Sequence, residues 1–376
     1  MRVYLKIAIL TLLTTLIVWL PFYLAVPELS GWGVSFETGM QAVWRNFDGP
    51  FYIIVSKTWY VKEAVRQTFS VPLPLEYYPA HLPFYPATIS VLELLFNGPH
   101  AMLLSTLIGS ILAFCMFFKY LSEFRLSRNP FGLTLVLMFL PARLLIARSI
   151  GAPETWFLFF ILASLYCYKK GKYWGAAAFG ALAQLTKSPA VLLFGAYGID
   201  FLFCFFRRKI EWKKLLIRWP LLLMPATVLL LFSFYKMQAG DFLAYFHSGD
   251  NFHLFWPPFS VFTPKGKFWT GDFWLEEVIW LWLIYGLTVA KLWKKKLYPE
   301  SFFAGIYFAS TLFVAHRDIA RYSLPLAPMA LIAWREVVSK KEFRWGLILL
   351  ILPIFLYTWN FILNNQAPIP DWAPYL

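Results

Sequence analysis

The chain has 376 residues, of which 60% are hydrophobic and only 14% are charged. A soluble domain carries roughly a quarter charged residues, so this composition excludes an ordinary soluble protein and predicts a single polytopic membrane domain over residues 1–376. The net charge of +14 could suggest a nucleic-acid partner. The Lys and Arg residues, however, fall in short clusters between apolar runs, and we expect no nucleic acid as a partner.

Long apolar runs occur along the whole chain. A membrane-spanning helix needs about 20 mostly apolar residues. The sequence therefore predicts an all-α integral membrane fold with about eleven transmembrane helices. In chain order the runs lie at 7–26, 101–121, 131–149, 152–168, 173–186, 188–206, 216–235, 273–291, 301–315, 321–334 and 345–363.

Two of these regions need a specific interpretation. The N-terminal run could be a cleaved signal peptide, but no clean small-residue cleavage site follows it, which favours a retained first helix. The runs 173–186 and 188–206 are short, and only Lys187 separates them. We therefore expect the chain to turn at Lys187, at a hairpin tip sunken among apolar helices.

Two long segments, 27–100 and 236–272, connect the predicted spans. In the first of them, residues 38–66 have the pattern of an amphipathic helix pair broken at Asp48-Gly49-Pro50, and residues 84–96 form a short apolar helix. We expect both to lie in the membrane interface as juxtamembrane helices.

The basic clusters fix the predicted orientation, because Lys and Arg concentrate in cytosolic loops. With the spans above, every cluster is cytosolic, the N-terminus lies inside and the C-terminus outside. Both long segments and all five His residues then lie on the extracytosolic side or at its border, where we expect any chemistry. The membrane would be the plasma membrane of a prokaryote, or the endoplasmic reticulum if the source is eukaryotic. The clusters are Arg2/Lys6, Lys119/Arg125/Arg128, Lys169/Lys170/Lys172, Arg207/Arg208/Lys209/Lys213/Lys214, Lys291/Lys294/Lys295/Lys296 and Arg335/Lys340/Lys341/Arg344.

Asp48 is the first candidate for chemistry. It follows Trp44 and precedes Gly49-Pro50 and Tyr52, which places a carboxylate among aromatic residues near the membrane surface. Such a carboxylate can accept the proton of a sugar hydroxyl, and partial burial would raise its pKa and make it a better base. Asp before Gly-Pro is also a natural helix N-cap. The two roles can coexist.

Further candidates lie at the ends of predicted helices. Tyr78, His81 and Tyr85 belong to a Pro- and Tyr-rich stretch that suits an aromatic groove for a sugar ring or an isoprenoid chain, or alternatively an interfacial aromatic belt. Glu154 opens an apolar helix at the outer boundary, which the helix dipole alone favours. An acidic residue at membrane depth is nonetheless a functional candidate.

Cations on the outer side go against the positive-inside trend. Lys187 could bind a lipid phosphate, or only snorkel. In the segment from His316 to Pro325, Arg321 with Tyr322 is the better phosphate candidate, because Arg offers forked hydrogen bonds. Arg317 and Asp318 could instead form a structural ion pair.

Metal and cofactor sites have little support in the sequence. His247, Asp250 and His253 have a spacing that suggests a metal, but without further ligands a loop lining an acceptor cleft is favoured. Cys115 and the other cysteines lie inside apolar runs, so we expect neither disulfide nor metal ligation from them. P-loop, dinucleotide and zinc-protease motifs are absent from the sequence. We expect no metal and no cofactor.

Taken in order, these segments resemble the polytopic glycosyltransferases of the GT-C superfamily, and most of all the PIG-V-like mannosyltransferases and their prokaryotic relatives. Residues 44–52 resemble a Trp-Asp-x-x-x-Tyr region, with Phe47 before the Asp. Residues 82–86 resemble a Pro-x-Tyr-Pro step, and residues 152–157 a Tyr-Ser-Glu-like helix start. Residues 177–189 resemble a Gly-Leu-Ala-x-x-Thr-Arg stretch with Lys187 in place of Arg. Residues 316–325 resemble a late His and Arg-Phe element with Tyr322 in place of Phe.

This resemblance implies transfer of a sugar, mannose by the PIG-V likeness, from a polyprenyl- or dolichyl-phosphate donor in the membrane. The acceptor would be a glycolipid, glycan or protein, and the reaction would be metal-independent and inverting. Asp48 would be the general base, and Arg321, Lys187, His316 and Arg317 would bind the donor phosphate. The predicted substrate contacts are Trp44, Tyr52, Tyr78, His81, Tyr85, Glu154, Tyr322, His247, Asp250 and His253.

Two alternatives remain open on the sequence. A transporter or flippase for a lipid-linked or small polar substrate would need polar residues at the midplane and discontinuous helices in matched halves, whereas the charges here gather at the outer edge. A lipid-linked glycan ligase would share the phosphate-binding cations but would not need a base at Asp48.

Overall fold

The computed structural model describes residues 2–29, 31–46, 48–70, 73–208, 211–249, 253–263 and 275–376. Within these ranges the regular structure is helical, and β pairing is limited to isolated bridges. The predicted all-α fold is therefore confirmed. Five helical stretches are long and apolar enough to cross a membrane, judged by length and composition: 2–23, 98–123, 188–207, 219–239 and 341–364.

The helices follow the predicted order. The first long segment contains α2 (Gln41–Trp44), α3 (Gly49–Thr58), α4 (Lys62–Thr68), the 3-10 helix η1 (Leu75–Ala80) and α5 (Phe84–Leu92). The predicted spans correspond to α1 (Arg2–Tyr23), α6 (Gly98–Glu123), α7 (Pro130–Phe139), α8 (Ala142–Ala147), α9 (Glu154–Lys169), α10 (Tyr173–Thr186), α11 (Val191–Arg208), α13 (Leu223–Ala239), α15 (Leu275–Lys294), α16 (Tyr298–Thr311), α17 (Ile319–Tyr322), α18 (Ala327–Ala333) and α20 (Lys341–Asn364). The shorter helices α12 (Trp212–Leu216), α14 (Ala244–His247) and α19 (Arg335–Val338) connect them.

Two of the predicted spans are broken. The expected helix over 131–149 divides into α7 and α8, because Pro141 has no N–H to continue the helix and favours the extended conformation that Leu140 adopts. The expected helix over 321–334 divides into α17, a 3-10 turn (Leu324–Leu326) that contains Pro325, and α18. The second break leaves α17 as a short separate helix.

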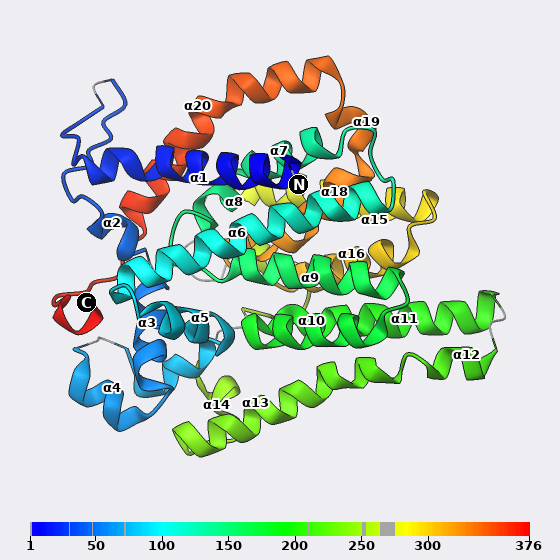
Figure 1. Cartoon of the computed structure of the whole chain (residues 1–376), viewed down its shortest axis with the longest axis horizontal. Coiled ribbons are helices and arrows are strands. Elements are labelled where there is room, and N and C mark those ends of the chain that lie inside the picture. The colour runs from blue at the N-terminus through cyan, green and yellow to red at the C-terminus, as the bar shows by residue number, and fades with distance from the viewer. Residues whose placement is uncertain are drawn as a thin grey trace.

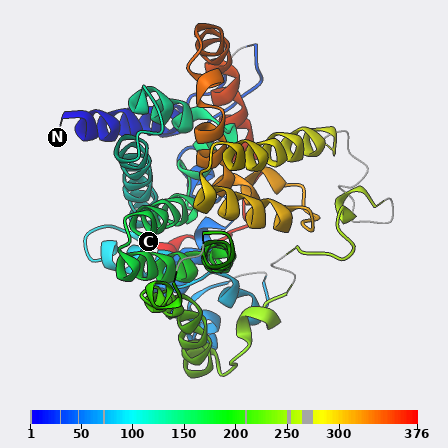
Figure 2. The ribbon, with the colours of Figure 1, turned by 90° about the vertical axis from the view of Figure 1, so that its right-hand side faces the viewer.

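The predicted outer and cytosolic elements lie at opposite ends of the molecule. Helices α2 to α5, α14 and the C-terminus lie toward the left of Figure 1, and α12 and α19 lie toward the right. Figure 2 looks along several helices from the α12 and α19 end, with the teal and green helices of the first half on one side and the yellow and orange helices beside them. Which end faces outward stays a prediction from the charge pattern.

Close packing of α6 and α9 fixes the start of α9. A Cβ on Gly109 would lie 2.9 Å from atoms of Thr155 and Trp156, so only glycine allows this approach. The Thr155 hydroxyl donates to the Thr106 carbonyl (3.2 Å), and Trp156 Nε1 donates to the Ser105 carbonyl (3.0 Å). These bonds hold the first turn of α9, and with it Glu154.

A second polar contact holds α1 in the bundle. The side chain of Arg148, which is fully buried, donates from Nη1 to the Thr15 hydroxyl (2.7 Å) and from Nη2 to the Thr14 hydroxyl (2.9 Å). Hydroxyls of α1 thus solvate a guanidinium that follows α8, as a buried charge requires.

Candidate functional site

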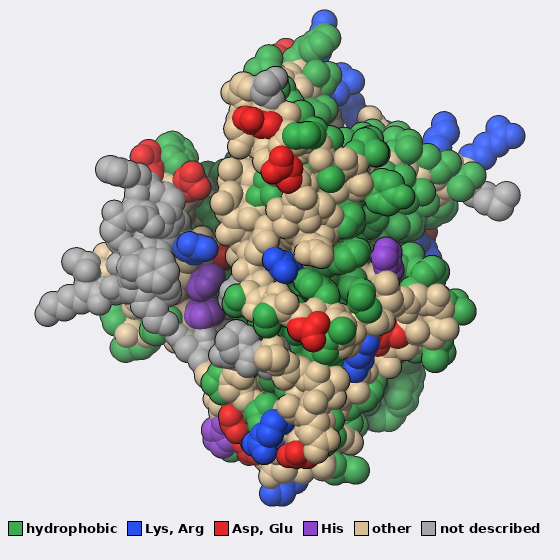
Figure 3. All heavy atoms as spheres, turned by 90° about the vertical axis from the view of Figure 1, so that its left-hand side faces the viewer, with side chains coloured by type: hydrophobic (Ala, Val, Ile, Leu, Met, Phe, Trp, Pro, Cys, Tyr) green, Lys and Arg blue, Asp and Glu red, His purple; other side chains and the backbone are tan. Residues whose placement is uncertain are grey.

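A cavity of about 790 Å³ lies between the first long segment and the helices around α9, α11, α16 and α20. Figure 3 shows the end of the molecule that carries α2 to α5, where acidic, basic and histidine side chains lie close to one another. Ten of the predicted site residues line the cavity: Asp48, Tyr52, His81, Glu154, Lys187, His253, His316, Arg317, Arg321 and Tyr322.

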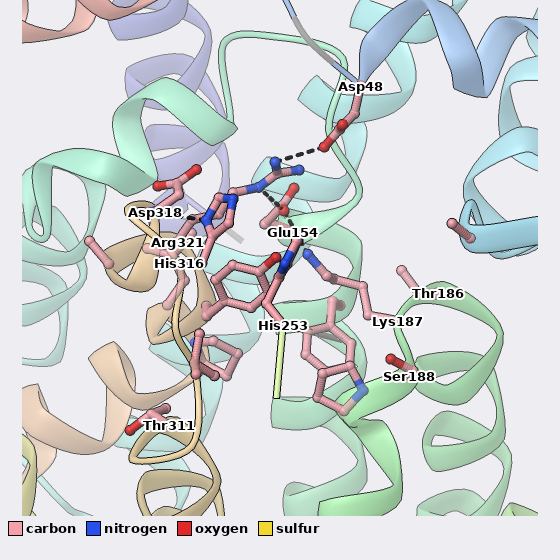
Figure 4. Close-up of a pocket in the computed structure, with 18 of the residues that line it drawn as sticks. Asp48, Glu154, Thr186, Lys187, Ser188, His253, Thr311, His316, Asp318 and Arg321 are labelled. Atoms are coloured by element: carbon pink, nitrogen blue, oxygen red, sulfur yellow. Dashed lines mark hydrogen bonds and ion pairs between the residues drawn. The ribbon is translucent and has the colours of Figure 1, made fainter. Parts of the chain in front are cut away.

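Four of these residues form a chain of ion pairs. Arg321 donates from Nη1 to Asp48 Oδ2 (2.7 Å) and from Nε to Glu154 Oε1 (2.6 Å). Lys187 Nζ donates to the same Glu154 oxygen (2.7 Å). Figure 4 shows Asp48 and Lys187 at the two ends of this chain, with Arg321 and Glu154 between them. The described cluster thus holds two cations and two carboxylates, and its formal charge is zero.

Each member is fixed by its own element. Asp48 lies between α2 and α3, Glu154 begins α9, and Lys187 is the extended residue between α10 and the 3-10 turn Ser188–Ala190. This confirms the expected turn at Lys187. Arg321 belongs to α17, whose Tyr322 carbonyl accepts a hydrogen bond from Tyr307 of α16 (3.1 Å).

Asp48 stands at the N-cap position of α3, with Pro50 in the first turn, but its side chain makes no capping hydrogen bond. The carboxylate binds Arg321 instead, so the capping interpretation is wrong for the side chain.

The expectation of a raised pKa is also wrong. Burial raises the pKa of Asp48, but the charge of Arg321, the nearby His81 and the hydrogen bond from Arg321 together outweigh it, so the pKa lies below its usual range.

Histidines form the other polar part of the cavity. The His253 and His316 rings lie 4.4 Å apart, and the Asp318 N–H donates to His316 Nδ1 (3.0 Å). Burial lowers the pKa of His81 to about 4, and burial with the nearby His253 does the same for His316. His316 is therefore neutral at neutral pH and offers a donor phosphate no full charge.

Acidification should destabilise the protein through these histidines. Their pKa of about 4 in the folded state lies below the roughly 6.5 of an unfolded chain. Between these values the unfolded state binds more protons, so the free energy of unfolding falls as pH falls, by up to about 3 kcal/mol per histidine. We expect the thermal midpoint to drop from pH 7 to pH 4.5, and to drop less in His81→Asn. An equal drop in His81→Asn and wild type would contradict this. His247→Asn, at an exposed site, is the control.

The structure does not bring four predicted substrate contacts to the cavity. Trp44 packs on the rings of His100 and Trp372, and Tyr78 is buried against Phe51. Tyr85 and His247 also lie outside the cavity lining.

Tyr85 is buried and connects two helices. Its hydroxyl donates to the Met102 carbonyl (3.0 Å) and lies 2.6 Å from the Thr106 hydroxyl, both on α6. We expect Tyr85→Phe to lose about 1 kcal/mol of stability and to bind a polyprenyl phosphate, the donor lipid that the resemblance implies, within twofold of wild type. A thermal-shift titration measures both quantities. Weakened binding at an unchanged thermal midpoint would instead support the predicted substrate contact.

The spacing of His247, Asp250 and His253 suggests a metal site, although a loop lining an acceptor cleft is favoured. His247 pairs with Asp241 (Nδ1–Oδ2, 2.6 Å) and is exposed, whereas His253 lies in the cavity. Asp250 lies outside the described residues. Among the residues that are described, no group of three His, Cys, Asp or Glu could hold a metal ion.

Asp318 does form an ion pair, but with a residue other than the neighbouring Arg317. Its carboxylate accepts from Arg143 of α8 (Nε–Oδ1, 2.8 Å), and the Arg143 guanidinium lies 3.7 Å from the centre of the Phe361 ring. Arg317 is exposed at the cavity rim. The ion pair with Arg143 therefore holds the loop before Arg321 in place.

Sequence reasoning missed several lining residues. Tyr77 lines the cavity, as do Asn360, Asn364 and Asn365 of the C-terminal region. A signal was present, because amides in an otherwise apolar spanning helix are functional candidates in the same way as charged residues.

The fold can be compared with known structures. ArnT from Cupriavidus metallidurans, solved bound to undecaprenyl phosphate, is similar to this chain with a TM-score of 0.54 and 17% sequence identity. The similarity covers 92% of this chain but 62% of the ArnT chain. No family model and no curated protein sequence matches. At this identity the similarity concerns the fold alone: the chain has an ArnT-like fold.

Proposed function

We propose that this chain is a membrane glycosyltransferase that transfers a sugar from a polyprenyl-phosphate-linked donor to an acceptor hydroxyl on the extracytosolic face, with inversion and without a metal ion. The observation that carries the proposal is Arg321, whose guanidinium binds Asp48 and Glu154 at once in the wall of the cavity. The sugar we propose is mannose, on the resemblance to the PIG-V-like mannosyltransferases.

Arg321 and Lys187 supply the site for the donor phosphate. Both cations line the cavity and meet at Glu154, so an anion that enters can bind them together. Arg and Lys are the usual phosphate ligands in proteins. ArnT, of the same fold, was solved with undecaprenyl phosphate bound, and this supports a polyprenyl phosphate as the ligand here.

The apolar part of the cavity suits the lipid chain. Phe157 and Leu158 of α9 and Val191 and Leu192 of α11 line the same cavity as Lys187. An isoprenoid chain can lie along these side chains while its phosphate remains at the cations. The donor then stays in the bilayer throughout the reaction.

In the transfer step, Asp48 takes the proton from the acceptor hydroxyl. The acceptor oxygen forms a bond to the anomeric carbon on the face opposite the phosphate, and the bond from that carbon to the phosphate oxygen breaks with its electron pair on the phosphate. The products are the glycoside, with an inverted anomeric centre, and a polyprenyl phosphate that has gained one negative charge. Arg321 and Lys187 stabilise this charge as it develops.

Arg321 also links the two events of the transfer, which are deprotonation of the acceptor by Asp48 and departure of the phosphate. While it binds Asp48 it keeps the pKa of that carboxyl low, which makes Asp48 a poor base. A donor phosphate that draws Arg321 away raises the basicity of Asp48 when substrate is present. Once Asp48 is protonated it no longer competes for Arg321, and the full guanidinium charge is available to the leaving phosphate.

A donor panel tests the proposal. We expect undecaprenyl phosphate to raise the thermal midpoint of the purified protein and undecaprenol, which lacks the phosphate, to leave it unchanged. Among undecaprenyl-phosphate hexoses, the mannose donor should be consumed at least about tenfold faster than the glucose donor, since a sugar epimer costs at least one hydrogen bond to the site. Equal stabilisation by undecaprenol would count against the phosphate site. Equal rates with the mannose and glucose donors would count against mannose as the sugar.

A further inference from the structure

The last long helix turns a polar face toward the cavity. Tyr357, Asn360, Phe361 and Asn364 of α20 line the cavity at helical spacing, and Asn365 follows the helix. The most apolar 18-residue stretch of this helix has a mean hydropathy of 2.1, and the helix is long enough to span a membrane. Asn360 and Asn364 are exposed, and the Asn364 amide donates to the Asn360 backbone carbonyl (2.9 Å). Polar side chains in an apolar spanning helix are functional candidates.

This amide face lies on the Asp48 side of the ion-pair chain. The Asn365 amide donates to Asn46 Oδ1 (3.4 Å), and the Ala367 N–H donates to the Arg45 carbonyl (2.7 Å). The end of α20 is thus bonded to the residues immediately before Asp48. From Asn365 the amides of Asn364 and Asn360 continue for about 6–8 Å along the helix.

The opposite end of the cavity is lined by a different type of side chain. After Lys187 and Ser188, the lining residues along the chain are Pro189 and the apolar Val191 and Leu192 of α11. Figures 1 and 2 place α11 and α20 on different sides of the bundle. The cavity therefore has an apolar arm beyond Lys187 and an amide arm beyond Asp48, with Arg321 between them.

The order of the reacting groups in an inverting transfer indicates which substrate occupies each arm of the cavity. The leaving phosphate, the anomeric carbon and the acceptor oxygen must lie in line. With the phosphate at Arg321 and Lys187 and the acceptor oxygen at Asp48, the rest of the acceptor extends beyond Asp48, into the amide arm. The lipid of the donor extends the other way.

We propose that the amide face of α20 is the acceptor subsite and that the acceptor is a glycan. This inference rests on the proposed function. Amide groups both donate and accept hydrogen bonds, as sugar hydroxyls require, and the exposed Tyr357 ring offers an apolar face for the C–H side of a sugar ring. A protein hydroxyl acceptor would need an extended backbone site in place of a set of side-chain amides.

The test compares wild type with Asn360→Ala/Asn364→Ala, using undecaprenyl-phosphate mannose as donor. Mannotriose and a Ser/Thr-rich peptide are the two acceptor probes. We expect wild type to use mannotriose and not the peptide. The double variant should show a KM for mannotriose at least about tenfold higher, the loss expected for one or two hydrogen bonds, with kcat and the Kd for undecaprenyl phosphate within twofold of wild type. Leu349→Ala, on an exposed part of the same helix, is the matched control.

Several outcomes would overturn the assignment. These are an unchanged KM in the double variant, transfer by wild type to the peptide alone, or an equal loss of undecaprenyl phosphate affinity in the double variant. Saturation-transfer NMR of mannotriose gives a readout without turnover when it compares Asp48→Asn with the triple variant Asp48→Asn/Asn360→Ala/Asn364→Ala. The signal should fall only in the triple variant. A wild type that neither binds undecaprenyl phosphate nor transfers mannose would overturn the proposed function itself, and the acceptor site with it.

Discussion

Asp48→Asn should fold normally and lose sugar transfer by about 10²- to 10⁴-fold in kcat, the range that general-base catalysis supplies. The amide is nearly the same size as the carboxylate and can still accept a hydrogen bond from Arg321, so the site keeps its shape. It cannot take the proton of an acceptor hydroxyl. Measuring kcat with undecaprenyl-phosphate mannose, together with the thermal midpoint, separates loss of chemistry from loss of fold.

The same variant should not lose donor affinity. Asp48 competes with an entering phosphate for Arg321, so its neutral replacement should bind undecaprenyl phosphate at least as tightly as wild type does. Asp241→Asn is the matched control, because Asp241 pairs with His247 outside the cavity, and its kcat should equal that of wild type. Near-normal turnover in Asp48→Asn would remove Asp48 as the base.

Arg321→Ala should have the largest effect on the site as a whole. It leaves Asp48 and the almost fully buried Glu154 without their shared partner, and the loss of one member of a buried ion pair costs about 3–5 kcal/mol. The affinity for undecaprenyl phosphate should fall by about 10- to 100-fold, the equivalent of a hydrogen bond to a charged group. Thermal melting and a lipid-phosphate titration measure the two effects.

Two further variants separate charge from geometry. Arg321→Lys keeps the charge but loses the fork that reaches two carboxylates, so its stability and affinity should fall between those of Arg321→Ala and wild type. Arg317→Ala removes an exposed cation at the cavity rim and should weaken binding less than Arg321→Ala, because solvent screens exposed charges. An Arg321→Ala protein with unchanged affinity for undecaprenyl phosphate would contradict the phosphate assignment.

The residues that form the ion-pair chain could be found from the sequence one at a time. Asp48, Glu154 and Lys187 each stand where a predicted helix begins or ends, and Arg321 goes against the positive-inside trend. Their connection could not be found. Arg321 lies 273 positions from Asp48 and 167 from Glu154, and only the packing of α3, α9 and α17 brings them together. For the same reason the direction of the Asp48 pKa was predicted wrongly, since burial was visible in the sequence and the facing guanidinium was not.

The helices themselves were mostly predictable, because their apolar runs are long and uniform. The errors came from proline, which ended helices inside the runs 131–149 and 321–334, and the second of these breaks creates the short helix that carries Arg321. Side chains in aromatic stretches were the least predictable. Tyr52 lines the cavity and Tyr85 is buried between α5 and α6, although both belong to equally Tyr-rich surroundings.

The most direct test of a glycosyltransferase uses wild-type protein in liposomes that contain undecaprenyl-phosphate mannose labelled in the sugar, with mannotriose outside. Transfer predicts that the label appears on mannotriose and that an equimolar amount of undecaprenyl phosphate is released, with both products forming about 10²- to 10⁴-fold more slowly in Asp48→Asn. A flippase would move the intact labelled lipid to the other leaflet without releasing undecaprenyl phosphate. That second result would contradict the proposed function.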